Sequence, residues 1–209
     1  MTHFTVGILL PAQQLSRAED YIAQQMAPYD EDEQVEPYIC YDEERAASDL
    51  AKEIADLELV IALNPPGYDI ERCRRRLDHL QQTSPADRYR EFLQYHERFD
   101  EAGRPLSTYN PQSRWDWYIV GGRWDGWLLD REAEDEAIAD NSAPVPQVID
   151  QEKWTYALIT PDGRWHERGK LSYWAHASHE KDEAVWHDEL RQLLERYLDH
   201  HLILIDAHI

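Results

Sequence analysis

Alternating and continuous apolar runs predict strands near both ends of the chain. Residues 4–10 (FTVGILL) form an apolar run that predicts a buried strand. Residues 154–168 have the pattern of a β-hairpin around the Pro-Asp-Gly turn at 161–163. Residues 201–209 (HLILIDAHI) predict a final strand.

Apolar residues at helical spacing predict the remaining regular structure. The helices are expected around Tyr21–Met26, over about 43–57, from Ile70 to Leu80, from Ser84 toward Gly103, and from Trp186 to Tyr197. Residues 59–63 fit either a short strand or the tail of the preceding helix. Residues 35–41 (VEPYICY) fit a second strand, near a sheet edge because of Pro37. The order β-α-β, helices, β-β-α-β predicts an α+β fold, a mainly antiparallel sheet covered by helices on one face. A ferredoxin-like core is one candidate.

The length of 209 residues suits one compact domain, or two small ones that share an interface. No Gly/Ser-rich linker divides the chain, so we predict a single α+β domain over residues 1–209. The acidic, Pro-containing segment at about 130–152 lacks a clear period and is predicted to be a mobile surface loop.

Composition and charge restrict the classes of function. The chain has 42% apolar and 11% aromatic residues, enough to build a core. Its net charge of −21 argues against a free-standing nucleic-acid binder, because phosphate recognition relies on Lys and Arg. The charge fits a basic protein partner or a cation-binding surface, and it also fits solubility alone.

The two cysteines and the ends of the sequence add little chemistry. Cys40 and Cys73 are isolated and cannot build a disulfide scaffold or a Cys-rich zinc site. No signal peptide and no apolar stretch of about 20 residues is visible, so we expect a cytoplasmic protein without a membrane span.

The segment RWDWYIVGGRWDGW (114–127) concentrates indoles, glycines and arginines. Glycines permit a close backbone approach, and guanidinium groups bind carboxylate or phosphate and stack on indoles. The segment therefore predicts a cradle for an anionic or ring-bearing ligand. Its candidate ligand-binding residues are Trp115, Asp116, Trp117, Gly121, Gly122, Arg123 and Trp124. The alternative is a Trp-rich mini-core in which Arg123 pairs with Asp116 or Asp125.

A second group of candidate residues lies on the hairpin and on the last strand. Asp206 and His208 share a strand face, and His166 would join them if the two strands were neighbours. Two histidines and a carboxylate can bind a divalent metal, Zn²⁺ or Mn²⁺, so His166, Asp206 and His208 are the candidate ligands. With Glu167 they are also the candidate acid–base residues. The alternative is an inert, solvated strand end.

Four motifs together resemble a family of uncharacterised proteins from bacteria and bacteriophages. They are APYDE at 27–31, WDWYxxGGRW at 115–124, WHExG at 165–169 and LIDAHI at 204–209. The resemblance runs through most of the chain. It implies a phage or mobile-element context and supplies no mechanism. Relatives usually carry a cysteine at the position of Ala207.

These observations lead to two hypotheses from different classes. In the first, a polar pocket lined by the GGRW segment and the His166, Asp206 and His208 group binds a small anionic or nucleotide-like ligand, with metal-assisted hydrolysis as its chemistry. In the second, the chain is a non-catalytic acidic factor that blocks a basic host protein. The sequence does not indicate an oligomeric state.

Overall fold

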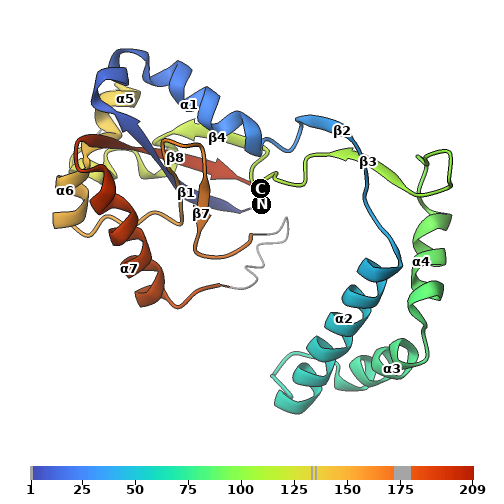
Figure 1. Ribbon diagram of the computed structural model, residues 1–209. Helices are drawn as coiled ribbons and strands as arrows, with labels where there is room; N and C mark the ends of the chain where they lie inside the picture. The colour runs from blue at the N-terminus through green and yellow to red at the C-terminus, as the bar shows by residue number, and fades with distance from the viewer. Residues whose placement is uncertain (1, 133, 135, 172–179) are drawn as a thin grey trace. The chain divides into compact units, whose positions relative to one another are not determined.

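A computed structural model describes residues 2–132, 134, 136–171 and 180–209. The contacts within it divide the chain into two compact units rather than the single domain predicted from the sequence. Unit 1 comprises residues 1–34 and 109–209, and unit 2 comprises residues 35–108. Both units are drawn in Figure 1.

Unit 1 is built on a mixed, mainly antiparallel sheet, as the sequence predicted. Its strand order is β4-β8-β1-β6-β7, and β5 also pairs with β8. The strands are β1 (His3–Pro11), β4 (Trp117–Val120), β5 (Ser142–Pro144), β6 (Ala157–Ile159), β7 (Trp165–Glu167) and β8 (His200–His208). The central strands β1 and β8 pair antiparallel along their whole lengths, and β1 pairs parallel with β6.

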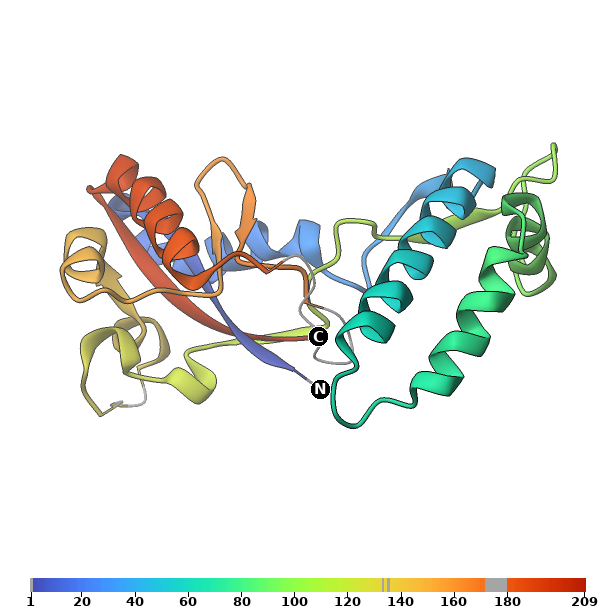
Figure 2. The same cartoon turned by 90° about the horizontal axis from the view of Figure 1, so that it is seen from below.

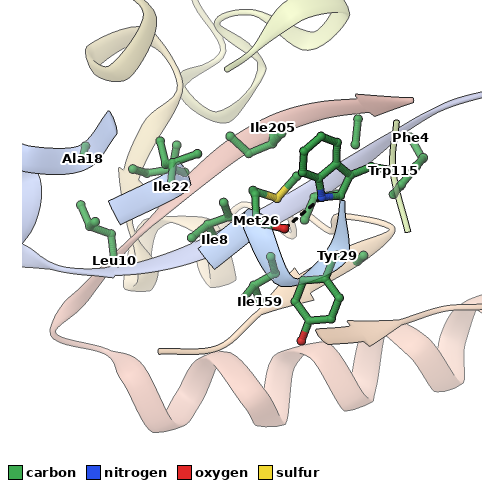
Figure 3. Close-up of a cluster of buried hydrophobic side chains, with 14 residues drawn as sticks. Phe4, Ile8, Leu10, Ala18, Ile22, Met26, Tyr29, Trp115, Ile159 and Ile205 are labelled. Carbon is green, nitrogen blue, oxygen red and sulfur yellow. Dashed lines mark hydrogen bonds between the residues drawn. The ribbon is translucent and has the colours of Figure 1, made fainter. Parts of the chain in front are cut away.

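One face of this sheet packs against the helix α1 (Ala18–Met26). Alternate residues of β1 point to the same side because successive side chains of a strand alternate between faces. The resulting core, drawn in Figure 3, includes Phe4, Val6, Ile8 and Leu10 of β1 with Ile203 and Ile205 of β8, and Ala18, Ile22 and Met26 of α1. Trp115 joins this cluster, and its Nε1–H donates to the Met26 carbonyl at 3.1 Å.

The opposite face is also covered by helices, whereas the sequence placed helices on one face only. Here α6 (Val145–Asp150) and α7 (Glu183–Leu194) pack on a second core. Its main residues are Leu9, Leu158, Leu202, Leu204, Val145, Val148, Trp186, Leu190 and Leu194. Figure 2 shows α7 lying over the central strands. The parallel strands β1 and β6 are direct neighbours. In the split βαβ of a ferredoxin-like fold another strand separates the parallel pair, so this sheet does not have the ferredoxin-like core that the sequence suggested.

Residues 130–152 contribute to the core and do not form the predicted loop. The described part contains α5 (Ala137–Asp140), β5 and α6. Ala143, Val145 and Val148 are fully buried. Asp140 is also buried; its burial raises its pKa, but hydrogen bonds from the Glu136 and Glu134 amides and from Arg131 outweigh this and lower it. These elements are too short to produce a recognisable period in the sequence.

Unit 2 consists of helices and a two-stranded ribbon. The ribbon pairs β2 (Gln34–Ile39) with β3 (Leu106–Tyr109), and α2 packs against both α3 and α4. These helices, seen in teal and green in Figure 2, are α2 (Glu43–Leu63), α3 (Ile70–Gln81) and α4 (Pro85–Gln94). Residues 59–63 are therefore the tail of a helix. Ser84 is the N-cap of α4 and forms a capping box with Asp87, and Pro85 is the first helical residue. These features explain where α4 begins.

The remaining regular structure consists of short 3₁₀ turns. They are η1 (Ala12–Arg17), η2 (Ala27–Tyr29), η3 (Gly122–Trp124), η4 (Trp127–Leu129) and η5 (Glu195–Tyr197). Within the part of the chain that the structure describes, no helix combines the length and apolar character needed to cross a membrane.

Candidate functional site

Two histidines meet on one face of the unit 1 sheet, at the end where β1 begins and β8 finishes. The antiparallel register places His3 opposite His208 and Thr5 opposite Asp206. Cross-strand partners point to the same face of a sheet, so His3, Asp206 and His208 share one face. The ring centroids of His3 and His208 are 5.1 Å apart, with an angle of 68° between the ring planes.

Each of these histidines is held by its own carboxylate. Nδ1 of His3 lies 2.8 Å from Oδ1 of Asp206, and Nδ1 of His208 lies 2.6 Å from Oδ1 of Asp116. The Asp206 side chain is 2% exposed, whereas that of Asp116 is 33% exposed. The site therefore contains one histidine held by a buried carboxylate and one held by a carboxylate that is partly open to solvent.

The pairing determines which imidazole nitrogens are available for chemistry. An ionised carboxylate only accepts hydrogen bonds, so Nδ1 carries a proton in each ring. Among the described residues, none forms a hydrogen bond with Nε2 of His3 or His208. Each imidazole is therefore held by a carboxylate, with its Nε2 left to bind a ligand or exchange a proton.

The Gly-Gly pair of the GGRW segment holds the buried carboxylate. Gly121 and Gly122 have φ angles of +71° and +56°, values that residues with a side chain rarely adopt. This turn brings the backbone N–H of Arg123 to Oδ2 of Asp206, at 3.0 Å. A Cβ atom on Gly122 would lie 2.5 Å from the same oxygen, so only glycine fits there.

Buried Asn141 fixes the other end of this turn. Its Oδ1 accepts from the Gly126 amide at 3.1 Å, and its Nδ2 donates to Asp125 and to the Ala137 carbonyl. Its backbone carbonyl accepts from the Leu204 amide of β8 at 2.9 Å. A residue inside the segment predicted as an acidic loop thus ties the turn that precedes this segment to β8.

The indoles of the predicted cradle do not surround a common ligand position. Trp115 is buried in the core of Figure 3, and Trp124 packs against the core on the opposite face of the sheet. Trp117 is 48% exposed. Arg123 and Trp124 line an open hollow of about 520 Å³ with Trp127 and Arg131. Within this segment, the indoles of Trp115 and Trp124 therefore serve packing, the glycine turn supports Asp206, and the indole of Trp117 is exposed.

The alternative pairing of Arg123 is not formed either. Asp116 bonds to His208, and Asp125 bonds to Asn141. The Arg123 side chain is exposed and makes no ion pair with another described residue. Only its backbone amide contributes to the histidine site.

His166 does not reach the other predicted metal ligands, so that part of the prediction is wrong. It lies on β7, and both β6 and β1 separate this strand from β8. At roughly 4.8 Å per strand, His166 is on the order of 14 Å from Asp206 across the sheet. Among the described residues there is no group of three or more His, Cys, Asp or Glu side chains that could hold a metal ion.

His166 and Glu167 make separate local contacts. His166 Nε2 lies 3.5 Å from the Thr160 hydroxyl, and burial lowers the pKa of this histidine. Glu167 Oε2 accepts from Trp165 Nε1 at 2.8 Å and lies 3.2 Å from Arg114 Nε. Glu167 thus helps to hold the hairpin and is not part of the histidine pair.

Sequence reasoning missed His3, which replaces His166 as the partner of Asp206 and His208. The available signal was its position two residues before Thr5 in the first predicted strand, because alternation puts both side chains on the face away from Phe4. Ala207 lies fully buried in the core on the opposite face from His208. A cysteine at that position would point away from the two histidines.

Comparisons with protein-family models, with curated proteins and with solved structures gave no match.

Proposed function

We propose that His3 and His208 act as a general acid–base pair that hydrolyses a small anionic ester of the phosphoester class. The observation that carries this proposal is the pair of carboxylate-held imidazoles, whose ring centroids are 5.1 Å apart. Histidine is the side chain best suited to exchange protons near neutral pH. Two such groups in one place supply both the acid and the base that hydrolysis requires.

The two histidines have complementary roles in the proposed reaction. Nε2 of one neutral imidazole removes a proton from the attacking water as its oxygen bonds to phosphorus. Nε2 of the other, protonated imidazole gives its proton to the leaving oxygen as the bond from that oxygen to phosphorus breaks. Asp206 and Asp116 keep each ring in the required tautomer through Nδ1. A second water restores the protonation states.

The proposal is tested by hydrolysis assays on phosphate monoesters and diesters. His3→Asn and His208→Asn should each lower kcat by about 10²–10⁴, the usual contribution of a positioned acid or base. His166→Asn is the matched control, because it removes a histidine from the same sheet but outside the pair. A bell-shaped pH dependence of kcat/KM would support two titrating groups. Unchanged turnover in both variants, or no turnover of any phosphoester by the native chain, would contradict the proposal.

The net charge of −21 favours a second candidate function, binding of a basic protein. Exposed acidic residues such as Asp32, Glu33, Glu43 and Glu44 would make such binding strongly dependent on salt. Co-purification at low and high ionic strength tests this function. A partner that is retained equally at both would contradict a charge-based interaction.

A further inference from the structure

Trp117 is an exposed aromatic side chain next to the histidine pair. It begins β4, directly opposite His208 in the antiparallel register. Its ring centroid lies 6.1 Å from that of His3, in an edge-on arrangement with an angle of 73° between the planes. The residue is nevertheless 48% exposed. The indole therefore stands beside both imidazoles with much of its surface open.

The strand pattern shows that this exposure does not come from a poorly packed strand. Tyr118, the next residue, points to the other face and packs edge-on against buried Trp115, with ring centroids 4.9 Å apart. Ile119 pairs with Asp206 and is 46% exposed on the same face as Trp117. The inner face of β4 is packed, while its outer face presents apolar surface beside a polar site.

An open indole next to acid–base groups fits a particular class of ligand. Every nucleobase has a flat face that stacks on an aromatic side chain, and such stacking tolerates different bases. In a nucleotide one sugar separates the base from the phosphate. That separation is comparable with the 6.1 Å between the Trp117 and His3 rings.

We propose that Trp117 is a stacking platform for a nucleobase, so that the substrates of the histidine pair are nucleoside phosphoesters. This assignment rests on the proposed function, because the phosphate is placed against Nε2 of His3 and His208. Trp117 is a binding and specificity residue here. It takes no part in proton transfer.

Two ligands that differ only in the base provide the test: adenosine 5′-monophosphate and ribose 5-phosphate. Calorimetry should show that Trp117→Ala weakens binding of the nucleotide about tenfold, while binding of ribose 5-phosphate is unchanged. Trp117→Phe should recover most of the loss, because phenylalanine keeps a stacking face. Ile119→Ala is the matched control, from the same strand and face with similar exposure, and should change neither affinity by more than about twofold.

Hydrolysis of the same two compounds separates this inference from the proposed function. With active protein, Trp117→Ala should raise KM for the nucleotide and leave kcat unchanged, since stacking contributes equally to ground and transition states. If nucleotide binding depends on Trp117 but nothing is hydrolysed, the platform stands and the acid–base function is wrong. Equal losses for both compounds, or unchanged nucleotide affinity in Trp117→Ala, overturn the platform whatever the hydrolysis result.

Discussion

Gly122 lies directly against the carboxylate of Asp206, so close that a Cβ atom would come within 2.5 Å of Oδ2. The φ angle of +56° at Gly122 lets the chain turn over this carboxylate and present the Arg123 amide to it. The same carboxylate accepts from His3. The Gly-Gly pair therefore determines the position of a histidine on another strand.

Gly122→Ala is expected to lower the free energy of unfolding by at least about 2 kcal/mol. A left-handed conformation costs a side-chain-bearing residue about 1–2 kcal/mol, and the clash with Asp206 adds to this. Denaturant melts measure the loss. Gly163→Ala is the control, because it has a φ of +80° but its nearest neighbour, Gln25, is 3.8 Å away. Equal losses in the two variants would show that the contact with Asp206 costs nothing.

Asp206→Asn is expected to lower catalysis more than Asp116→Asn. If the new side-chain amide accepts from the Arg123 N–H through its oxygen, it must present its NH₂ group to His3 Nδ1, which moves the ring proton to Nε2. The available basic nitrogen is then lost, with an expected fall in kcat of about 10²-fold. Asp116 is more exposed, so water can replace its contact with His208. Steady-state kinetics check the order, and a larger effect at Asp116 would contradict it.

Substitutions of the neighbouring Trp115 and Trp117 are expected to differ sharply in how much they lower the free energy of unfolding. Trp115→Ala should cost about 3–5 kcal/mol, because it empties a core position and removes the hydrogen bond to Met26. Trp117→Ala should cost less than about 1 kcal/mol, since its indole is half exposed. Chemical denaturation of the two variants side by side measures both values. Similar losses would mean that Trp117 is a packing residue.

The sequence predicted the parts of the fold that depend on local pattern. The hairpin containing His166 and the last strand containing His208 follow from alternation and turn residues, and both are present. Their relative position depends on the order of strands in the sheet, which local periodicity does not encode. His166 was therefore assigned to the wrong neighbour.

Of the four residues of the candidate site, the sequence predicted all but His3, for the same reason. Asp206 and His208 follow from strand alternation, and Asp116 was singled out beside the tryptophans. The contact between His3 and Asp206 joins residues at opposite ends of the chain, and no local signal reports it. The role of Gly122 was expected only as a close backbone approach, without the identity of the group approached.

Stability should fall as the pH is lowered through the range in which histidine takes up its proton. Burial lowers the pKa of His166 and of His201 below 6.5, so the unfolded chain binds these protons more readily than the folded chain. Their contribution is fully present above about pH 6.5 and is lost as the pH falls toward the folded pKa values.

Unfolding free energies at about pH 7.5 and about pH 5.5 measure this dependence. His166→Gln should reduce it, because glutamine does not titrate. The control is His79→Gln, which replaces an exposed histidine of α3. An unchanged pH dependence in His166→Gln would show that the burial of His166 does not affect stability.

The response to divalent metals is expected to depend on His3 rather than on His166. If Zn²⁺ or Mn²⁺ binds the folded chain, the melting temperature should rise with metal concentration, because a ligand specific for the folded state stabilises it. His3 and His208 lie side by side, and each has an Nε2 without a hydrogen-bond partner among the described residues. His3→Ala should therefore abolish the rise, and His166→Ala should retain it, since β6 separates the strand of His166 from that of His3, and β6 and β1 separate it from that of His208. Thermal melts with and without a chelator make the comparison. Loss of the metal response in His166→Ala alone would place the metal at the hairpin and contradict the site assigned here.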